Sequence, residues 1–139
     1  MSSTKIHTNP DGTTVEVPRD AAIGAGVFLG FNVKIGLRCE LGKGVCILGD
    51  SIIGNDVFVG SQVAVGLNVI VNHSVKILPN TGIGNNTSIG RNSRIGRYVD
   101  VGSGVKIGPD CHIPEDWVIG NDKIVNPGNE QNGYLPQIH

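Results

Sequence analysis

The chain is poor in aromatic residues, cysteine and long apolar segments. Three Phe, two Tyr and one Trp among 139 residues are too few to fill an ordinary globular core. The three cysteines, odd in number and without a CxxC pair, argue against a disulfide framework and against a thiolate zinc site. No apolar run is long enough for a membrane span or a secretion signal, and a net charge of −1 disfavours nucleic acid and anionic membranes as partners. We therefore expect a cytoplasmic protein with no nucleic-acid or membrane partner.

Glycine, by contrast, is abundant, with 21 residues, and it belongs to a repeat of six residues. An aliphatic residue occurs at every sixth position from Val17 to Val125, 19 times without an insertion or slip. Glycine directly follows 13 of these 19 residues. The first 16 residues found four places after an aliphatic are all Ala, Val, Cys, Ser or Thr. A strict internal period of this kind predicts a solenoid.

The period also predicts how the solenoid is wound. Residues two apart on a strand point to the same side, so Val57 and Val59 point inward while Phe58 points outward. The other residues of each unit form a corner, where Gly, Asn and Asp tolerate the backbone angles of a tight turn. Three units close one triangular coil of 18 residues. The sequence therefore predicts an all-β parallel β-helix of about six to seven coils, with no inserted loop.

The repeat divides the chain into three parts. We expect an N-terminal cap over 1–16, the β-helix over 17–124 and a C-terminal tail over 125–139. Trp117 replaces a small inner residue near the end of the repeat, and we expect its bulky ring to close the apolar column. For the turn-rich tail, our hypothesis is a contact with a neighbouring subunit.

The outward residues of the strands form three columns, one on each face of the prism. The isoleucine face carries Lys34, Ile52, Ile70, Ser88, Lys106 and Ile124. The small-residue face carries Phe28, Cys46, Ala64, Gly82, Asp100 and Val118. The basic face carries Ala22, Glu40, Phe58, Lys76, Arg94 and His112.

Two of these columns are largely apolar or small, which favours burial against other subunits. In a threefold ring each subunit offers two different faces to its neighbours. We therefore expect a homotrimer formed through the Ile52/Ile70 and Phe28/Ala64 faces. The alternative is a monomer with scattered surface aliphatics.

Units such as IGNDVF, VGSQVA, IGRNSR and IGPDCH resemble the [LIV]-G-x-x-[small]-x signature of the hexapeptide-repeat superfamily, over about four-fifths of the chain. The resemblance implies a left-handed coil and a homotrimer. It also implies an acyl-CoA-dependent transferase whose active sites lie between subunits. Many such enzymes hold their acceptor with an inserted loop or an extra domain, and this chain shows neither in its unbroken repeat.

His73 is the candidate catalytic residue. It lies on the corner between the isoleucine face and the basic face. VNHSV resembles a motif of sialic acid O-acetyltransferase-type sugar acetyltransferases, in which the histidine is the general base. Asn72 and Ser74 stand where that motif has acidic residues, so a carboxylate that orients the imidazole is missing. Asp56, one coil below Ser74, is a possible substitute. The competing interpretation is an inert histidine on a solvated turn.

The expected co-substrate is acetyl-CoA, with a sugar or a small amine or hydroxyl compound as acceptor. Lys76, Arg91 and Arg94 are placed to meet the phosphates of CoA. The residues predicted to bind the acyl donor or the acceptor are Asn55, Asp56, Asn72, Ser74, Lys76, Arg91 and Arg94.

Other functions of this fold remain to be weighed. A γ-carbonic anhydrase needs three histidines per zinc, and this chain has no H-x4-H pair, so we expect no metal. An ice-binding prism would repeat Thr-x-Thr along one face, which is not seen. The serious alternative is a non-catalytic trimeric scaffold, or an oligomerisation or regulatory module.

Overall fold

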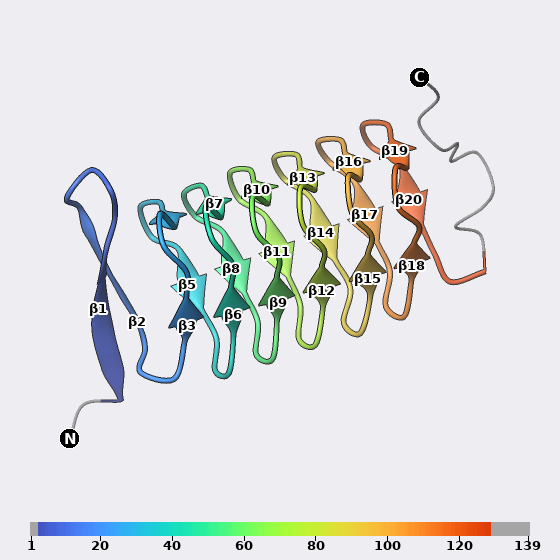
Figure 1. The fold of residues 1–139 in the computed structure, drawn as a ribbon. Coiled ribbons are helices and arrows are strands. Elements are labelled where there is room, and N and C mark those ends of the chain that lie inside the picture. The colour runs from blue at the N-terminus through green and yellow to red at the C-terminus, as the bar shows by residue number, and fades with distance from the viewer. Residues whose placement is uncertain (1–2, 129–139) are drawn as a thin grey trace.

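The computed structural model describes residues 3–128. In this range an antiparallel hairpin is followed by a parallel β-helix, and no segment is helical. Figure 1 shows the coils stacked in a row from β3 to β20. The expected all-β fold is confirmed, with three parallel sheets and no inserted loop. A helix long and apolar enough to span a membrane does not occur in this part of the chain.

Each of the three sheets contains six strands of two residues. The basic face is formed by β3 (Ala22–Ile23), β6 (Glu40–Leu41), β9 (Phe58–Val59), β12 (Lys76–Ile77), β15 (Arg94–Ile95) and β18 (His112–Ile113). The small-residue face is formed by β4 (Phe28–Leu29), β7 (Cys46–Ile47), β10 (Ala64–Val65), β13 (Gly82–Ile83), β16 (Asp100–Val101) and β19 (Val118–Ile119). The isoleucine face is formed by β5 (Lys34–Ile35), β8 (Ile52–Ile53), β11 (Ile70–Val71), β14 (Ser88–Ile89), β17 (Lys106–Ile107) and β20 (Ile124–Val125).

Residues 18 apart are vertical neighbours, as the period predicts. Val71 pairs with Ile53 on one side and with Ile89 on the other, and all three are buried. The second residue of each strand points into the prism, and together with the small inner residues it forms one continuous core. Trp117 is buried at the end of this core, as expected for a residue that closes the apolar column.

From Ile23 onward, all three corners of the prism have a left-handed backbone at the third residue after each inner aliphatic. Fourteen of these 18 positions are Gly, Asn or Asp, which adopt a positive φ at low cost. Four are not: Arg38, Gln62, Ser74 and Tyr98, with φ between 56° and 62°. A left-handed backbone at such residues is strained and is most common at functional sites.

An antiparallel hairpin covers the N-terminal end of the prism. Its strands are β1 (Thr4–Thr8) and β2 (Thr14–Pro18), so the hairpin extends two residues beyond 16. Most of the predicted tail lies outside the described residues, as does its proposed contact with a neighbouring subunit.

Candidate functional site

His73 lies where β11 passes into β12, on the corner that joins the isoleucine face to the basic face. We call this vertical edge the His73 corner. Its successive pairs, from the N-terminal end upward, are Leu37–Arg38, Asn55–Asp56, His73–Ser74, Arg91–Asn92 and Pro109–Asp110. The backbone locks these levels together, because Ser74 N donates to Asn55 O at 2.9 Å and Asn92 N donates to His73 O at 3.1 Å. The structure therefore brings Asn55, Asp56 and Arg91 next to His73, as predicted.

The imidazole of His73 is held by the backbone. The N–H of Asn55 donates to Nδ1 of His73 at 2.8 Å. A neutral imidazole that accepts at Nδ1 carries its proton on Nε2. In this arrangement Nε2 is a hydrogen-bond donor, whereas a general base needs a free lone pair there.

Asparagine makes the same contact at equivalent corner positions. The Oδ1 of Asn55 accepts from the N–H of Leu37 at 2.8 Å, one coil below. On the corner between the small-residue and isoleucine faces, Asn85 accepts from Leu67 and Asn121 from Ser103. His73 thus occupies a position at which a side-chain acceptor satisfies a backbone N–H of the preceding coil.

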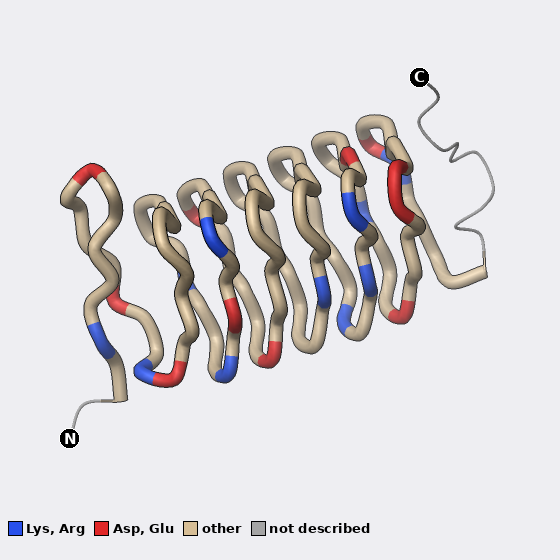
Figure 2. Tube along the Cα trace, in the orientation of Figure 1, with Lys and Arg blue, Asp and Glu red and all other residues tan. Residues whose placement is uncertain are grey.

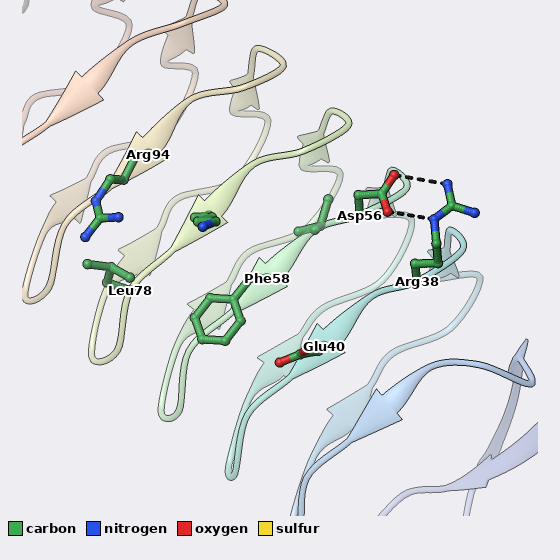
Figure 3. A pocket seen from close by; sticks show the side chains of 8 residues that line it. Arg38, Glu40, Asp56, Phe58, Leu78 and Arg94 are labelled. Atoms are coloured by element: carbon green, nitrogen blue, oxygen red, sulfur yellow. Dashed lines mark hydrogen bonds and ion pairs between the residues drawn. The ribbon is translucent and has the colours of Figure 1, made fainter.

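Asp56 does not orient His73, which corrects the expectation that it replaces the missing carboxylate. Its Oδ1 and Oδ2 accept from Nε and Nη2 of Arg38 at 2.7 and 3.0 Å (Figure 3). This paired hydrogen bond lowers the pKa of Asp56 below its ordinary value. The side chain turns toward the coil below because the guanidinium presents two donors in the geometry of a carboxylate.

The basic face carries a shallow depression of about 400 Å³ beside the His73 corner. Lys76 and Arg94 are neighbours on adjacent strands, and Figure 2 shows the basic segments of β12 and β15 side by side. Figure 3 shows the ring of Phe58 between the side chains of Glu40 and Leu78. The residues lining it are Arg38, Glu40, Asp56, Val57, Phe58, Lys76, Leu78 and Arg94.

The predicted binding residues therefore divide into two groups. Lys76, Arg94 and Asp56 line the depression, whereas Asn55, Asn72, Ser74 and Arg91 lie on the corner with His73. The Nδ2 of Asn72 donates to the carbonyl of Ile89 at 2.9 Å, so this amide braces two coils.

The sequence-based prediction of binding residues missed five residues that line the depression: Arg38, Glu40, Val57, Phe58 and Leu78. The spacing of 18 already placed Arg38 beneath Asp56, and that spacing was the available signal. Among the described residues, no group of three His, Cys, Asp or Glu side chains lies close enough to hold a metal ion.

No protein-family model and no curated protein matches the chain, whereas 75 chains of solved structures do. A histidine-to-asparagine mutant of perosamine N-acetyltransferase from Caulobacter crescentus, in complex with CoA and GDP-perosamine, matches with a TM-score of 0.64 and 19% identity. The match covers 70% of this chain and 49% of that chain.

Two further structures are similar over more of this chain. The acetyltransferase domain of PglB from Neisseria gonorrhoeae has a TM-score of 0.52 and 20% identity, over 87% of this chain and 56% of that chain. A hexapeptide transferase family protein from Anaplasma phagocytophilum has a TM-score of 0.51 and 15% identity, over 92% of this chain and 81% of that chain. The chain spans about half the length of the first two proteins. These comparisons show that the chain has the parallel β-helix fold of these transferases.

Proposed function

We propose that the chain is an acyl-CoA-dependent acyltransferase that transfers an acetyl or similar group to a sugar or to a small amine or hydroxyl compound. The observation that carries this proposal is a basic depression beside a histidine corner on this fold. The same fold occurs in an N-acetyltransferase that binds CoA and a sugar nucleotide. No metal is needed for this chemistry.

Lys76 and Arg94 bind the phosphates of CoA in the proposed complex. They are exposed, adjacent and of one sign, and a phosphate between them accepts charge-assisted hydrogen bonds. Arg38 lines the same depression, but its guanidinium is already bound to Asp56.

His73 is the proposed general base. The hydroxyl or amine of the acceptor attacks the thioester carbon and gives its proton to Nε2. The C–S bond then breaks, and the leaving thiolate of CoA takes this proton from Nε2, which returns the imidazole to its neutral form. For Nε2 to accept, the neutral imidazole must carry its single ring proton on Nδ1. The reaction therefore requires that the hydrogen bond from the Asn55 N–H be broken when substrates bind.

The test combines binding and turnover. Calorimetric titration with acetyl-CoA measures the affinity, and release of free CoA in the presence of amino sugars measures the turnover. His73→Asn should retain acetyl-CoA affinity and lose turnover, because asparagine keeps the structural contact and cannot transfer a proton. Lys76→Gln and Arg94→Gln should weaken affinity. Full turnover by His73→Asn would refute the base assignment.

A non-catalytic trimeric scaffold is the second candidate. The observation that favours it is the position of His73, which makes a contact that Asn55, Asn85 and Asn121 make elsewhere for purely structural reasons. A wild-type protein that binds neither acetyl-CoA nor longer acyl-CoA would favour the scaffold over the enzyme.

A further inference from the structure

Two adjacent faces of the prism differ in the size of their outward side chains. On the isoleucine face, Ile52 and Ile70 are 46% and 43% exposed. On the small-residue face, Cys46, Ala64 and Gly82 leave a shallow hollow that continues over neighbouring strands. Large side chains on one face and small ones on the next are the shapes required for contact between two copies of one chain.

We propose that the isoleucine face packs on the small-residue face of a second copy in a closed trimer, and that this contact brings the partner subunit's Asn80 and Tyr98 to His73. The catalytic part of this proposal rests on the proposed acyltransferase function, whereas the packing does not.

Threefold symmetry fixes which rows meet. Rotation about an axis parallel to the prism involves no shift along it, so each coil faces the same coil of its neighbour. An outward residue of the isoleucine face then lies opposite the residue six places earlier in the partner, at a height difference of about 1.6 Å for strands 4.8 Å apart. The rule gives six rows. Each row is written here with the residue of the isoleucine face first and the partner's residue second: Lys34 with Phe28, Ile52 with Cys46, Ile70 with Ala64, Ser88 with Gly82, Lys106 with Asp100, and Ile124 with Val118.

These rows are complementary in size and in charge. Two isoleucines meet small residues, and the one acidic residue of the small-residue face meets a lysine. Asp100 and Lys106 are exposed, and neither forms an ion pair within residues 3–128. In the proposed trimer the partner subunit supplies a counter-charge to each of these two residues.

The other two pairings of faces are less favourable. The isoleucine face against the basic face would place Ile70 on Lys76 and Lys106 on His112. The small-residue face against the basic face would bury Lys76 against Gly82 and leave the isoleucines in solvent.

The chosen pairing decides which corners meet at the outer rim. The corner shared by the two packed faces points to the threefold axis. The outer end of the isoleucine face is the His73 corner, and the outer end of the partner's face is its corner between the basic and small-residue faces. That edge, the Tyr98 corner, carries Ser61–Gln62, Pro79–Asn80 and Arg97–Tyr98 in its middle coils.

At this rim the partner subunit's Asn80 lies about 2 Å above the level of His73, and the partner subunit's Tyr98 lies about 7 Å above it. The phenol of Tyr98, 57% exposed in the single chain, is long enough to reach back toward the level of His73. Its ring offers a stacking surface and its hydroxyl a hydrogen bond to a sugar or nucleotide.

Backbone strain provides an independent indication of the same place. The four residues with positive φ other than Gly, Asn and Asp are Arg38, Gln62, Ser74 and Tyr98. Two lie on the His73 corner and two on the Tyr98 corner, and none lies on the corner that points to the axis. The strained positions thus flank the rim that the trimer assembles, as expected for a functional site.

The register is tested by charge reversal, with molar mass from sedimentation equilibrium as the readout. Lys106→Asp and Asp100→Lys should each weaken the trimer, and the double variant should restore it. Circular dichroism confirms that the coil is intact, since both positions are exposed. A Lys106→Asp protein that assembles with wild-type affinity would overturn the pairing.

The rim is tested without activity by mixing two single-cysteine variants. A short bis-maleimide should link His73→Cys chains to Asn80→Cys chains in mixed trimers and should link neither variant alone. Wild type controls for Cys39, Cys46 and Cys111. Absence of linked dimers from an intact mixed trimer would show that the two corners do not meet.

Mixed trimers of His73→Ala and Tyr98→Ala chains then test the role of Tyr98. Each homotrimer should be nearly inactive, whereas equal mixing should restore about a quarter of wild-type turnover, because one interface in four combines an intact His73 with an intact Tyr98. If the wild type is active but the mixed trimers regain no turnover, the proposed role of Tyr98 is refuted. An inactive wild type with positive cross-linking would refute the acyltransferase and leave the interface established.

Discussion

Individual residues on the corners of this prism bind the coil beneath them. His73 accepts from Asn55, Asn55 accepts from Leu37, and Arg38 binds Asp56 through two hydrogen bonds. Each contact joins residues 18 apart, so a corner side chain fastens one coil to the next. A substitution on a corner therefore affects two coils.

The Arg38–Asp56 pair gives a prediction on pH. Arg38→Gln removes the hydrogen bonds that depress the pKa of Asp56, so this pKa should rise toward its ordinary value. A carboxyl NMR titration measures the change. Because the depressed pKa belongs to the folded state, the pair stabilises the fold above the ordinary aspartate pKa, and this contribution is lost as the pH falls through the folded-state value.

Unfolding temperatures provide the control for this prediction. The difference between wild type and Arg38→Gln should shrink as the pH falls below about 4. The double variant Arg38→Gln/Asp56→Asn should show no such pH dependence. An unchanged pKa of Asp56 in Arg38→Gln would contradict the assigned cause.

Among the structural elements, the N-terminal hairpin closes an exposed strand edge. The first coil has no coil beneath it, and its backbone groups need partners. Lys5 Nζ donates to Ala21 O at 2.7 Å, and His7 Nε2 lies 2.9 Å from Val27 O. Asn9 is buried and satisfies both backbone groups of Leu29, accepting from its N–H at 2.8 Å and donating to its carbonyl at 2.7 Å.

Asn9→Ala should lower the free energy of unfolding by about 2 kcal/mol or more, because it leaves a buried donor and a buried acceptor without partners. Urea unfolding followed by circular dichroism measures the loss. Asn9→Asp retains the acceptor for the Leu29 N–H and should lie between Asn9→Ala and wild type. A loss within error of zero for Asn9→Ala would mean that water replaces the amide and that the hairpin is not a cap.

The small inner residues also connect neighbouring coils. The hydroxyl of Thr81 is buried, donates to the carbonyl of Gly96 at 2.6 Å and accepts from the N–H of Val99 at 3.2 Å. Ser51, Thr87 and Ser93 make equivalent pairs of bonds.

Thr81→Val should cost about 1–2 kcal/mol in the free energy of unfolding, because both bonds are lost while the shape is kept. Val63 and Val99 occupy the same inner position one coil below and one coil above, so valine fits. Thr81→Ser keeps the hydroxyl and serves as the matched control in the same urea titration. If Thr81→Ser costs more than Thr81→Val, methyl packing and not hydrogen bonding dominates.

The whole molecule is a stack in which each coil touches only the coils above and below it. The distance between two adjacent coils therefore depends on the size of the residues where their backbones face each other. A Cβ added at Gly90 would lie 2.4 Å from the backbone carbon of Gly108 and from the nitrogen of Pro109. At Gly120, near the C-terminal end of the stack, the nearest atom to such a Cβ would be Cε of Lys123 at 3.9 Å.

Gly90→Ala should therefore push two coils apart and cost at least about 3 kcal/mol, or prevent folding. Gly120→Ala makes the same chemical change without a backbone clash and should remain close to wild type. Unfolding midpoints in urea compare the two. Equal stability of both variants would show that the stack adjusts its spacing at low cost.

Much of this architecture could be predicted, because three units of six residues make a turn of 18 and thereby fix the vertical neighbours. Ile53, Val71 and Ile89 stack as expected, and Lys76 and Arg94 lie side by side on the basic face. The site was predicted less well. Its residues were assigned to the correct coils, but their hydrogen-bond partners were not predicted. Asp56 binds Arg38, and the ring of His73 accepts from the backbone N–H of Asn55.

The sequence by itself determined the coil, its three faces and the residues that each face presents, because strand alternation and the period leave no freedom in these. Only the tertiary structure decided which way corner side chains turn. The direction of a corner side chain depends on which backbone groups of the coil beneath lack a hydrogen-bond partner. The six-residue period of the sequence does not reveal these groups. For His73 this direction decides which ring nitrogen carries the proton, and hence what must change before the ring can act as a base.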